Sequence, residues 1–119
     1  MKHLDTVEKV IVYIITRDID ELTGLTRYQL AGMFDVNQNY LTELFKKEMN
    51  MTVFDFLDFE KMKRAEKMLI TRYDMSVEQI SRRMGIARCK HFRKKFRRFY
   101  GLNPGKYRLL FKSQRIRLY

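Results

Sequence analysis

The chain has 119 residues, of which 45% are hydrophobic, with one proline, five glycines and a single cysteine. This composition favours one small helical domain, or two very small subdomains that share a helix, and disfavours a turn-rich β-sandwich. The lone Cys89 excludes an internal disulfide, and no apolar run approaches the ~18 residues of a membrane span. We therefore expect a cytoplasmic protein with no membrane-spanning segment and no signal peptide.

Charge is distributed unevenly along the chain. The net charge is +11, but residues 1–59 carry six Lys/Arg against ten Asp/Glu, a charge of −4. Residues 60–119 carry nineteen Lys/Arg against four Asp/Glu, a charge of +15. Such a basic half needs a polyanion or strong solvation. Nucleic acid is the first candidate and an anionic membrane surface the second.

The first part of the chain predicts two helices separated by a turn. Apolar spacing favours a helix over about residues 6–17, and a turn is expected near residues 18–25. Thr26 begins the next helix, because Gln29 follows it at the spacing of a capping box. The expected inner faces are Val7, Val10, Ile11, Ile14 and Ile15 in the first helix, and Leu30, Met33 and Phe34 in the second.

A third helix and a longer fourth one follow. Asp35 marks the turn, and Asn37 is expected to cap the third helix, which ends near Asn50 in a left-handed conformation. Thr52 caps a longer helix that continues to about Ile70. Their inner faces are expected to hold Tyr40, Leu41, Leu44 and Phe45, and then Phe56, Leu57, Phe59, Met62, Ala65, Met68 and Leu69.

The basic half predicts a second turn and two further helices. Gly85 suits a left-handed turn, and a helix is expected over about residues 87–100, ending at Gly101. Pro104 begins the last helix in the first helical position. Residues 113–119 are basic and are expected to fray.

The two halves repeat one another. Ser76 and Gln79 repeat the capping box, and sliding the halves by 50 residues before the turn and 51 after it superimposes their patterns. The repeat predicts an all-α fold of about seven helices, with two helix-turn-helix subdomains joined by a long connecting helix. The expected parts are a first subdomain over 1–52, a connecting helix over 53–70, and a second subdomain with a basic tail over 71–119. The paired residues are Gln29 with Gln79, Leu30 with Ile80, Leu41 with Phe92, Phe45 with Phe96 and Phe56 with Tyr107.

The helix over 87–100 carries the strongest functional signal. Phe92, Phe96 and Phe99 form one apolar stripe, and most other positions are cationic. A charged helix face is usually only solvated, but this one has a single sign and follows a helix-turn-helix turn. It is therefore predicted to contact DNA, with Arg and Lys suited to the acceptors of guanine. The cationic residues are Arg88, Lys90, Arg93, Lys94, Arg97 and Arg98.

The corresponding helix of the first half is a weaker candidate. Its exposed positions are expected to be Gln38, Asn39, Thr42 and Glu43. Asn and Gln can bond adenine, Glu can accept from cytosine, and Lys46 could meet phosphate. Nearby acids, including Asp35 and Glu48, would repel phosphate. The alternative is that this unit is a structural partner with weak DNA contact.

These motifs resemble the DNA-binding domain of the AraC/XylS family of bacterial transcription regulators. The resemblance covers about residues 7–108, and its most specific part is the run Gly-x-x-Pro-x-x-Tyr-Arg that ends at Arg108. It implies that both second helices enter successive major-groove segments. The implied contact positions are Gln38, Asn39, Thr42 and Glu43 in the first unit, and Cys89, Lys90, Arg93 and Lys94 in the second.

The resemblance also implies partners. The chain is similar to the family's short stand-alone activators, which bind as monomers and recruit RNA polymerase, because it has no room for an effector domain. It could also be the excised end of a longer regulator. Operator, target genes and inducer stay open.

Other functions receive less support from the residues. A protein-interaction module could dock RNA polymerase or another regulator through the acidic half, near Asp18, Asp20 and Glu21, while the basic half binds DNA without sequence preference. A basic membrane-surface helix is disfavoured, because the aromatic stripe fits a core. Cys89 and His91 are too few for a zinc site, so no metal or cofactor is expected. No nucleophile–base pair or phosphate loop indicates an enzyme.

Overall fold

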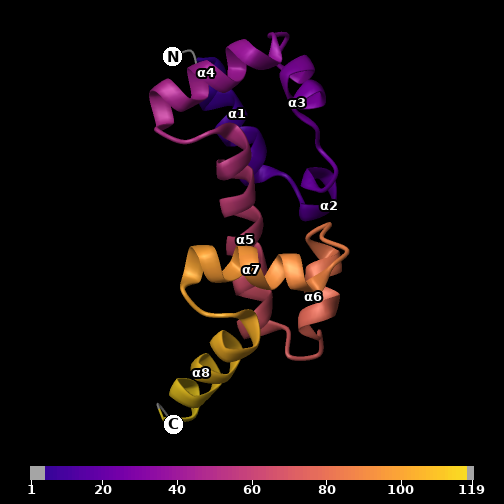
Figure 1. Ribbon diagram of the computed structural model, residues 1–119, viewed down its shortest axis with the longest axis vertical. Helices are drawn as coiled ribbons and strands as arrows, with labels where there is room; N and C mark the ends of the chain where they lie inside the picture. The colour runs from indigo at the N-terminus through magenta and orange to yellow at the C-terminus, as the bar shows by residue number, and fades with distance from the viewer. Residues whose placement is uncertain (1–4, 118–119) are drawn as a thin grey trace. The chain divides into compact units, whose positions relative to one another are not determined.

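All the regular secondary structure in the part of the chain that the structure describes is α-helical. A computed structural model describes residues 5–117, in which eight helices and no strand occur (Figure 1). The all-helical expectation is confirmed. The helices are α1 (Thr6–Thr16), α2 (Ile19–Leu22), α3 (Arg27–Met33), α4 (Gln38–Met49), α5 (Val53–Thr71), α6 (Val77–Arg83), α7 (Cys89–Tyr100) and α8 (Pro104–Arg117).

The helix beyond the expected seven is α2. A turn was expected over residues 18–25, but Ile19–Leu22 form one helical turn. Ile19 and Leu22 are three residues apart and both are buried, so this turn points two apolar side chains into the core. Four residues are too few to produce a periodic signal, which explains why the sequence pattern missed the helix.

Two compact units divide the chain. The first ends at Glu60 and the second begins at Lys61, so the boundary falls within α5. One helix-turn-helix belongs to each unit: α3 and α4 to the first, α6 and α7 to the second. The connecting helix α5 contributes one end to each unit, which agrees with the expectation of two subdomains joined by a long helix.

In the first unit, α4 is the helix against which α1 and α3 pack. Phe45 of α4 is fully buried, and its ring lies 5.7 Å from that of Phe56 in α5. Burial of one large apolar side chain stabilises a fold by roughly 1.5–3 kcal/mol. This core therefore holds α4 firmly. Its buried members are Val7, Val10, Ile14, Leu22, Leu30, Ala31, Leu41, Phe45, Val53 and Leu57.

Four residues expected in the core are exposed instead. The exposed fractions are 48% for Ile15, 49% for Met33, 55% for Tyr40 and 40% for Phe59. The apolar stripe of a small helix covers only part of its circumference, so apolar residues at its edges remain in solvent. For Tyr40, this correction moves an aromatic side chain from the core to the surface of α4.

In the second unit, α6 and α8 both pack on α7. Phe92 and Phe96 of α7 are fully buried, as expected, whereas Phe99 is half-buried. The ring of Phe96 stacks on Tyr100 at 4.6 Å. Tyr107 of α8 meets both rings edge-on at 5.5 Å. This aromatic cluster joins α7 to α8.

The helix ends differ from the expected ones in two places. α7 begins at Cys89, not at 87, because Arg88 has an extended backbone and serves as its N-cap residue. α8 extends to Arg117, past residue 113, from which fraying was expected. Residues 118 and 119 lie outside the described part. The expected starts at Thr26, Ser76 and Pro104 are confirmed.

Candidate nucleic-acid interface

In the first helix-turn-helix, a side chain caps the start of each of the two helices, α3 and α4. Thr26 Oγ1 accepts a hydrogen bond from the Gln29 amide at 3.1 Å, and Gln29 Oε1 accepts one from the Thr26 amide at 3.1 Å. Asn37 Oδ1 accepts from the amides of Asn39 and Tyr40 at 2.8 and 3.4 Å. These bonds satisfy amides that a helix start leaves unpaired. The sequence therefore specifies where α4 begins.

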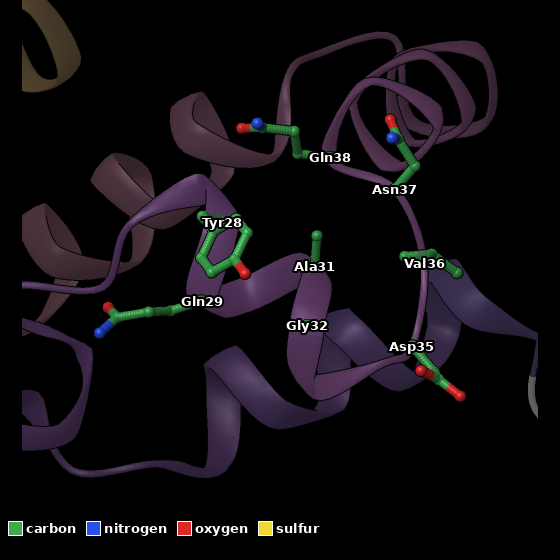
Figure 2. Close-up of a pocket in the computed structure, with 8 residues that line it drawn as sticks. All are labelled: Tyr28, Gln29, Ala31, Gly32, Asp35, Val36, Asn37 and Gln38. Atoms are coloured by element: carbon green, nitrogen blue, oxygen red, sulfur yellow. The ribbon is translucent and has the colours of Figure 1, made fainter.

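A hollow of about 440 Å³ lies at this turn, between α3 and the start of α4 (Figure 2). Figure 2 shows Ala31 between Tyr28 and Asn37, with Asp35 farther along the turn. Tyr28 is 77% exposed. The surface beside α4 is thus polar and open. Its lining consists of Tyr28, Gln29, Ala31, Gly32, Asp35, Val36, Asn37 and Gln38.

The predicted contact residues of α4 lie mostly in solvent. Gln38, Asn39, Glu43 and Lys46 are exposed, and Thr42 is half-buried. Thr42 Oγ1 donates to the Gln38 carbonyl at 2.8 Å, so its hydroxyl proton is used within the helix. This leaves Thr42 its methyl group and an acceptor lone pair for a ligand.

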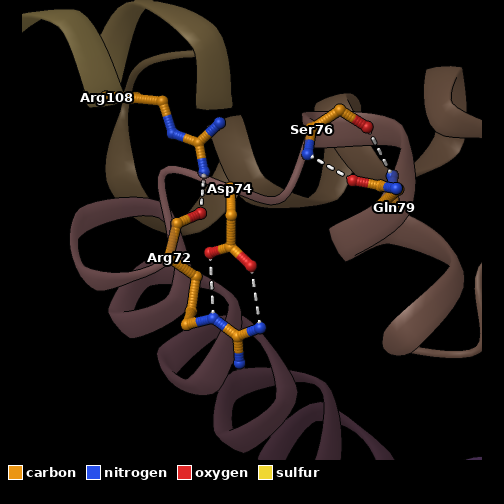
Figure 3. A network of polar contacts seen from close by, with 5 residues as sticks. All are labelled: Arg72, Asp74, Ser76, Gln79 and Arg108. Carbon is orange, nitrogen blue, oxygen red and sulfur yellow. Dashed lines mark hydrogen bonds and ion pairs between the residues drawn. The ribbon is translucent and has the colours of Figure 1, made fainter.

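The second helix-turn-helix has the same start and a stronger turn. Ser76 and Gln79 exchange hydrogen bonds of 3.1 and 2.8 Å in a capping box (Figure 3). Ser81 Oγ donates to the Ile86 carbonyl at 2.7 Å, and the Ile86 amide donates to the Ser81 carbonyl at 3.0 Å. Gly85 adopts φ +79° between them. In the first unit Ala31, the equivalent of Ser81, makes only the backbone bond.

α7 presents a cationic face over its buried phenylalanine seam. Arg88, Lys90, Arg93, Lys94 and Arg97 are exposed, and Cys89 is half-buried. The first turn of α7 contains no acidic residue. These cationic side chains therefore lie in solvent, where their natural counterions are anions.

Other basic residues of this unit are bound to the protein itself (Figure 3). Arg72 donates from Nε and Nη2 to the two carboxylate oxygens of Asp74, each at 3.0 Å. The hydrogen bond from Arg72 lowers the pKa of Asp74, and the same bond raises the pKa of Arg72. Arg108 donates to the carbonyls of Leu69 and Arg72 at 2.9 and 3.0 Å, which caps the end of α5. Arg108 thus has a structural contact that charge counting could not reveal.

The described residues offer no other recognisable kind of site. Among residues 5–117, no group of three or more His, Cys, Asp or Glu is placed to hold a metal ion. No helix in this range is long and apolar enough to cross a membrane. The sequence pattern did not predict that Tyr28 and Tyr40 lie on the surface. Helical spacing alone does not distinguish a core position from a position at the edge of an apolar stripe.

Comparison with known proteins assigns the family. Residues 30–109, more than half of the chain, match the Helix-turn-helix domain family. The uncharacterized HTH-type transcriptional regulator YpdC of Escherichia coli K12 is 31% identical over 89 residues, which are 75% of this chain and 31% of that protein. The Msm operon regulatory protein of Streptococcus mutans is 27% identical over 79 residues, 66% of this chain and 28% of that protein.

Solved structures agree on the fold. The C-terminal domain of the response regulator yesN from Fusobacterium nucleatum has a TM-score of 0.75 at 25% identity and covers 87% of this chain and 99% of that one. The DNA-binding domain of AdpA, solved with a target DNA, has a TM-score of 0.80 at 20% identity and covers 94% and 97%. The chain spans about a third or less of the first curated relatives that it matches. The matched family, the regulators and the fold together show that the chain belongs to the AraC/XylS family of helix-turn-helix transcription regulators.

Proposed function

We propose that this chain binds duplex DNA by sequence and inserts α4 and α7 into successive segments of the major groove. The carrying observation is the face of α7, where exposed cations cover a buried phenylalanine seam directly after a helix-turn-helix turn. A helix has the diameter that the major groove admits. The buried side chains of Phe92 and Phe96 fix the position of α7 in its unit and therefore the positions of the cations on its surface. Reading of bases requires such fixed positions, whereas non-specific attraction to phosphate does not.

The two helices carry different chemistry. On α7, Lys90, Arg93 and Lys94 suit the two acceptors of guanine. On α4, Gln38 and Asn39 suit adenine, while Glu43 suits the amino group of cytosine. Phosphate contacts supply most of the affinity, and a few base contacts supply the specificity. We therefore expect a bipartite site with unlike halves.

Selection of bound duplexes from a random pool tests this function directly. Two short motifs about one helical turn apart are expected, because each unit presents one second helix. A single motif would reduce the first unit to a structural support. No enrichment, or an affinity that is indifferent to salt, would reject the proposal.

We further infer an activator that acts as a monomer and contacts RNA polymerase through its acidic unit. The supporting observation is α2, whose cap residue Asp18 and first-turn residues Asp20 and Glu21 are exposed. Reversing these three charges to Lys is expected to preserve duplex affinity and to lower transcription from a bound promoter. Unchanged transcription by this variant would rule out the contact with RNA polymerase. Sedimentation of the DNA complex would show whether one or two copies of the chain bind each duplex.

A further inference from the structure

One side of α8 combines exposed leucines with positive charge. Leu109 and Leu110 are 65% and 53% exposed. They follow the exposed Lys106 at three and four positions, so the three residues share one face of the helix, the basic face of α8. Residues 104–117 contain no Asp or Glu, so α8 supplies no negative charge to this face. Large apolar side chains that lie together on a charged surface indicate an interaction site.

The outer side of α1 has the same spacing with the opposite charge. Ile11 and Val12 follow Glu8 at three and four positions, and Ile15 follows it at seven, which places all four on the acidic face of α1. Val12 and Ile15 are 43% and 48% exposed, and Glu8 and Ile11 are half-buried. The fully buried residues of α1 lie elsewhere on the helix. The acidic face is therefore open to a partner.

The two faces are complementary in both charge and apolar surface. If two such helices lie parallel, Glu8 of one lies beside Lys106 of the other. The apolar residues one turn farther along then lie beside one another, because both faces have the same spacing. Contact between the apolar residues removes them from water, and the opposite charges favour this register over others. A second copy of this chain thus carries the surface that the basic face of α8 needs.

The order of the two units on DNA would bring these faces together. In the proposed function, each copy places its first unit in one major-groove segment and its second unit in the next. On two adjoining sites of the same direction, the second unit of one copy is then the neighbour of the first unit of the other. We propose that the basic face of α8 packs on the acidic face of α1 from a second copy at the adjoining site; this inference rests on the proposed function. Each copy still occupies its own site as a monomer.

The contact should be weak in the absence of DNA. A stable interface buries roughly 800 Å² per partner, far more than three or four partly exposed side chains provide. Two molecules held at neighbouring sites experience an effective concentration on the order of millimolar, which compensates for a small interface. The second copy should therefore bind paired sites about fivefold to tenfold more tightly than a single site. Since the two faces differ, the contact is heterologous and can continue along a row of sites.

Charge reversal of each face, followed by mixing, is the main test. The full chain is followed by NMR over a dilution series from about 1 mM downward, the range of such effective concentrations. Amide signals of α1 and α8 should shift with concentration. Glu8→Lys and Lys106→Glu should each abolish these shifts, because like charges then meet. An equimolar mixture of the two variants should restore them, since Lys106 of the first variant can pack beside Glu8 of the second.

A matched variant separates this contact from general charge. Lys9→Glu also reverses one charge on α1, at an exposed position about 100° around the helix from Glu8, and should leave the shifts unchanged. The NMR spectrum of each variant also verifies its fold. Parent signals that stay constant on dilution, or a mixture that fails to recover the shifts, would overturn the inference. Equal losses for Lys9→Glu and Glu8→Lys would do the same.

An anionic membrane surface is the competing ligand for a basic face with exposed leucines. Vesicles with anionic lipid are therefore added to the dilute parent chain. Signals of Leu109 and Leu110 that respond to vesicles, but not to a second copy, would overturn the inference in favour of a lipid surface. Signals that respond to the second copy alone would support it.

Duplexes with one site or with two adjoining sites connect the contact to the proposed function. Glu8→Lys and Lys106→Glu should keep the preference for the single site and lose the gain on paired sites. If the mixture restores the dilution shifts but no duplex is preferred, the proposed function fails and the contact between copies stands. If sequence preference persists, but neither dilution shifts nor a gain on paired sites occurs, the contact is wrong and the function stands.

Discussion

The Tyr107 hydroxyl donates a hydrogen bond of 3.1 Å to Glu66 Oε1, across 41 positions of the chain. The same tyrosine ring meets Phe96 and Tyr100 of α7 edge-on. This side chain of α8 therefore contacts two other helices, α5 and α7, within the second unit. Burial, together with the bond to Glu66, raises the pKa of Tyr107.

Tyr107→Phe should destabilise the second unit and change its response to alkali. Loss of the hydroxyl removes one net hydrogen bond, about 1 kcal/mol at neutral pH. Because the folded-state pKa is raised, the stabilisation is complete below the ordinary tyrosine pKa of about 10 and is lost as pH rises through the folded value. Urea unfolding at several pH values measures this, and the variant should lose less stability above pH 10 than the parent protein.

Tyr28→Phe is the matched control for that measurement, because this tyrosine is 77% exposed. Its unfolding free energy should follow the parent at every pH. Identical alkaline slopes for Tyr107→Phe and the parent would show that the Glu66 bond does not couple ionisation of Tyr107 to folding.

The two turns should respond oppositely to substitution at equivalent positions. Gly85 has φ +79° and Asp35, its equivalent 50 residues earlier, has φ +59°. A left-handed residue with a Cβ is strained by about 1–2 kcal/mol, so Gly85→Ala should lower the unfolding free energy by roughly that amount. Asp35→Gly should raise it by a few tenths of a kcal/mol, since relief of strain exceeds the added chain entropy. Chemical denaturation decides, and a stabilising Gly85→Ala would contradict this account.

Ser81→Ala should weaken the second turn. The Ser81 side chain is buried and its hydroxyl donates to the Ile86 carbonyl. Removal of the hydroxyl takes away this hydrogen bond and should lower the unfolding free energy by about 1–2 kcal/mol. Thr71→Ala is the control: its hydroxyl also bonds a carbonyl, that of Lys67, but in solvent. Thermal unfolding should show a clear loss for the first variant and little for the second. Equal losses would refute the importance of burial at Ser81.

The substitutions Arg93→Ala on α7 and Thr42→Ala on α4 compare how much each helix contributes to DNA binding. Arg93 is exposed on α7, and its loss should cost about 1–3 kcal/mol of discrimination at one base pair. Thr42 is half-buried and its hydroxyl proton is used within α4, so its loss should matter less. Affinities for a selected duplex and its single-base variants provide the measurement. Equal effects at both sites would contradict the expectation that Arg93 of α7 contributes more to base discrimination than Thr42 of α4.

Local chemistry alone was enough to predict several features correctly. Thr26 with Gln29 and Ser76 with Gln79 form the expected capping boxes, because a cap depends on residues only three positions apart. Asn37 caps α4, and Asn50 takes the left-handed end. Periodicity placed Phe92 and Phe96 in the core, because most other positions of the helix are cationic and the apolar stripe is the one side that can be buried. The all-helical class and the repeated turn followed from these short-range rules.

Contacts between distant segments decided the rest. The four residues of α2 are too few to predict a helix from periodicity. The helix is recognised only in the structure, where Ile19 and Leu22 are buried. Whether Tyr40 faced the core or the solvent depended on how much of α4 its neighbours covered. The structural role of Arg108 distinguishes it from the other cations. That role becomes visible only in its hydrogen bonds to carbonyls at the end of α5, some forty residues earlier in the chain. Sequence spacing thus determines which residues share a helix face, whereas only packing determines which face becomes surface and which charges remain available to a ligand.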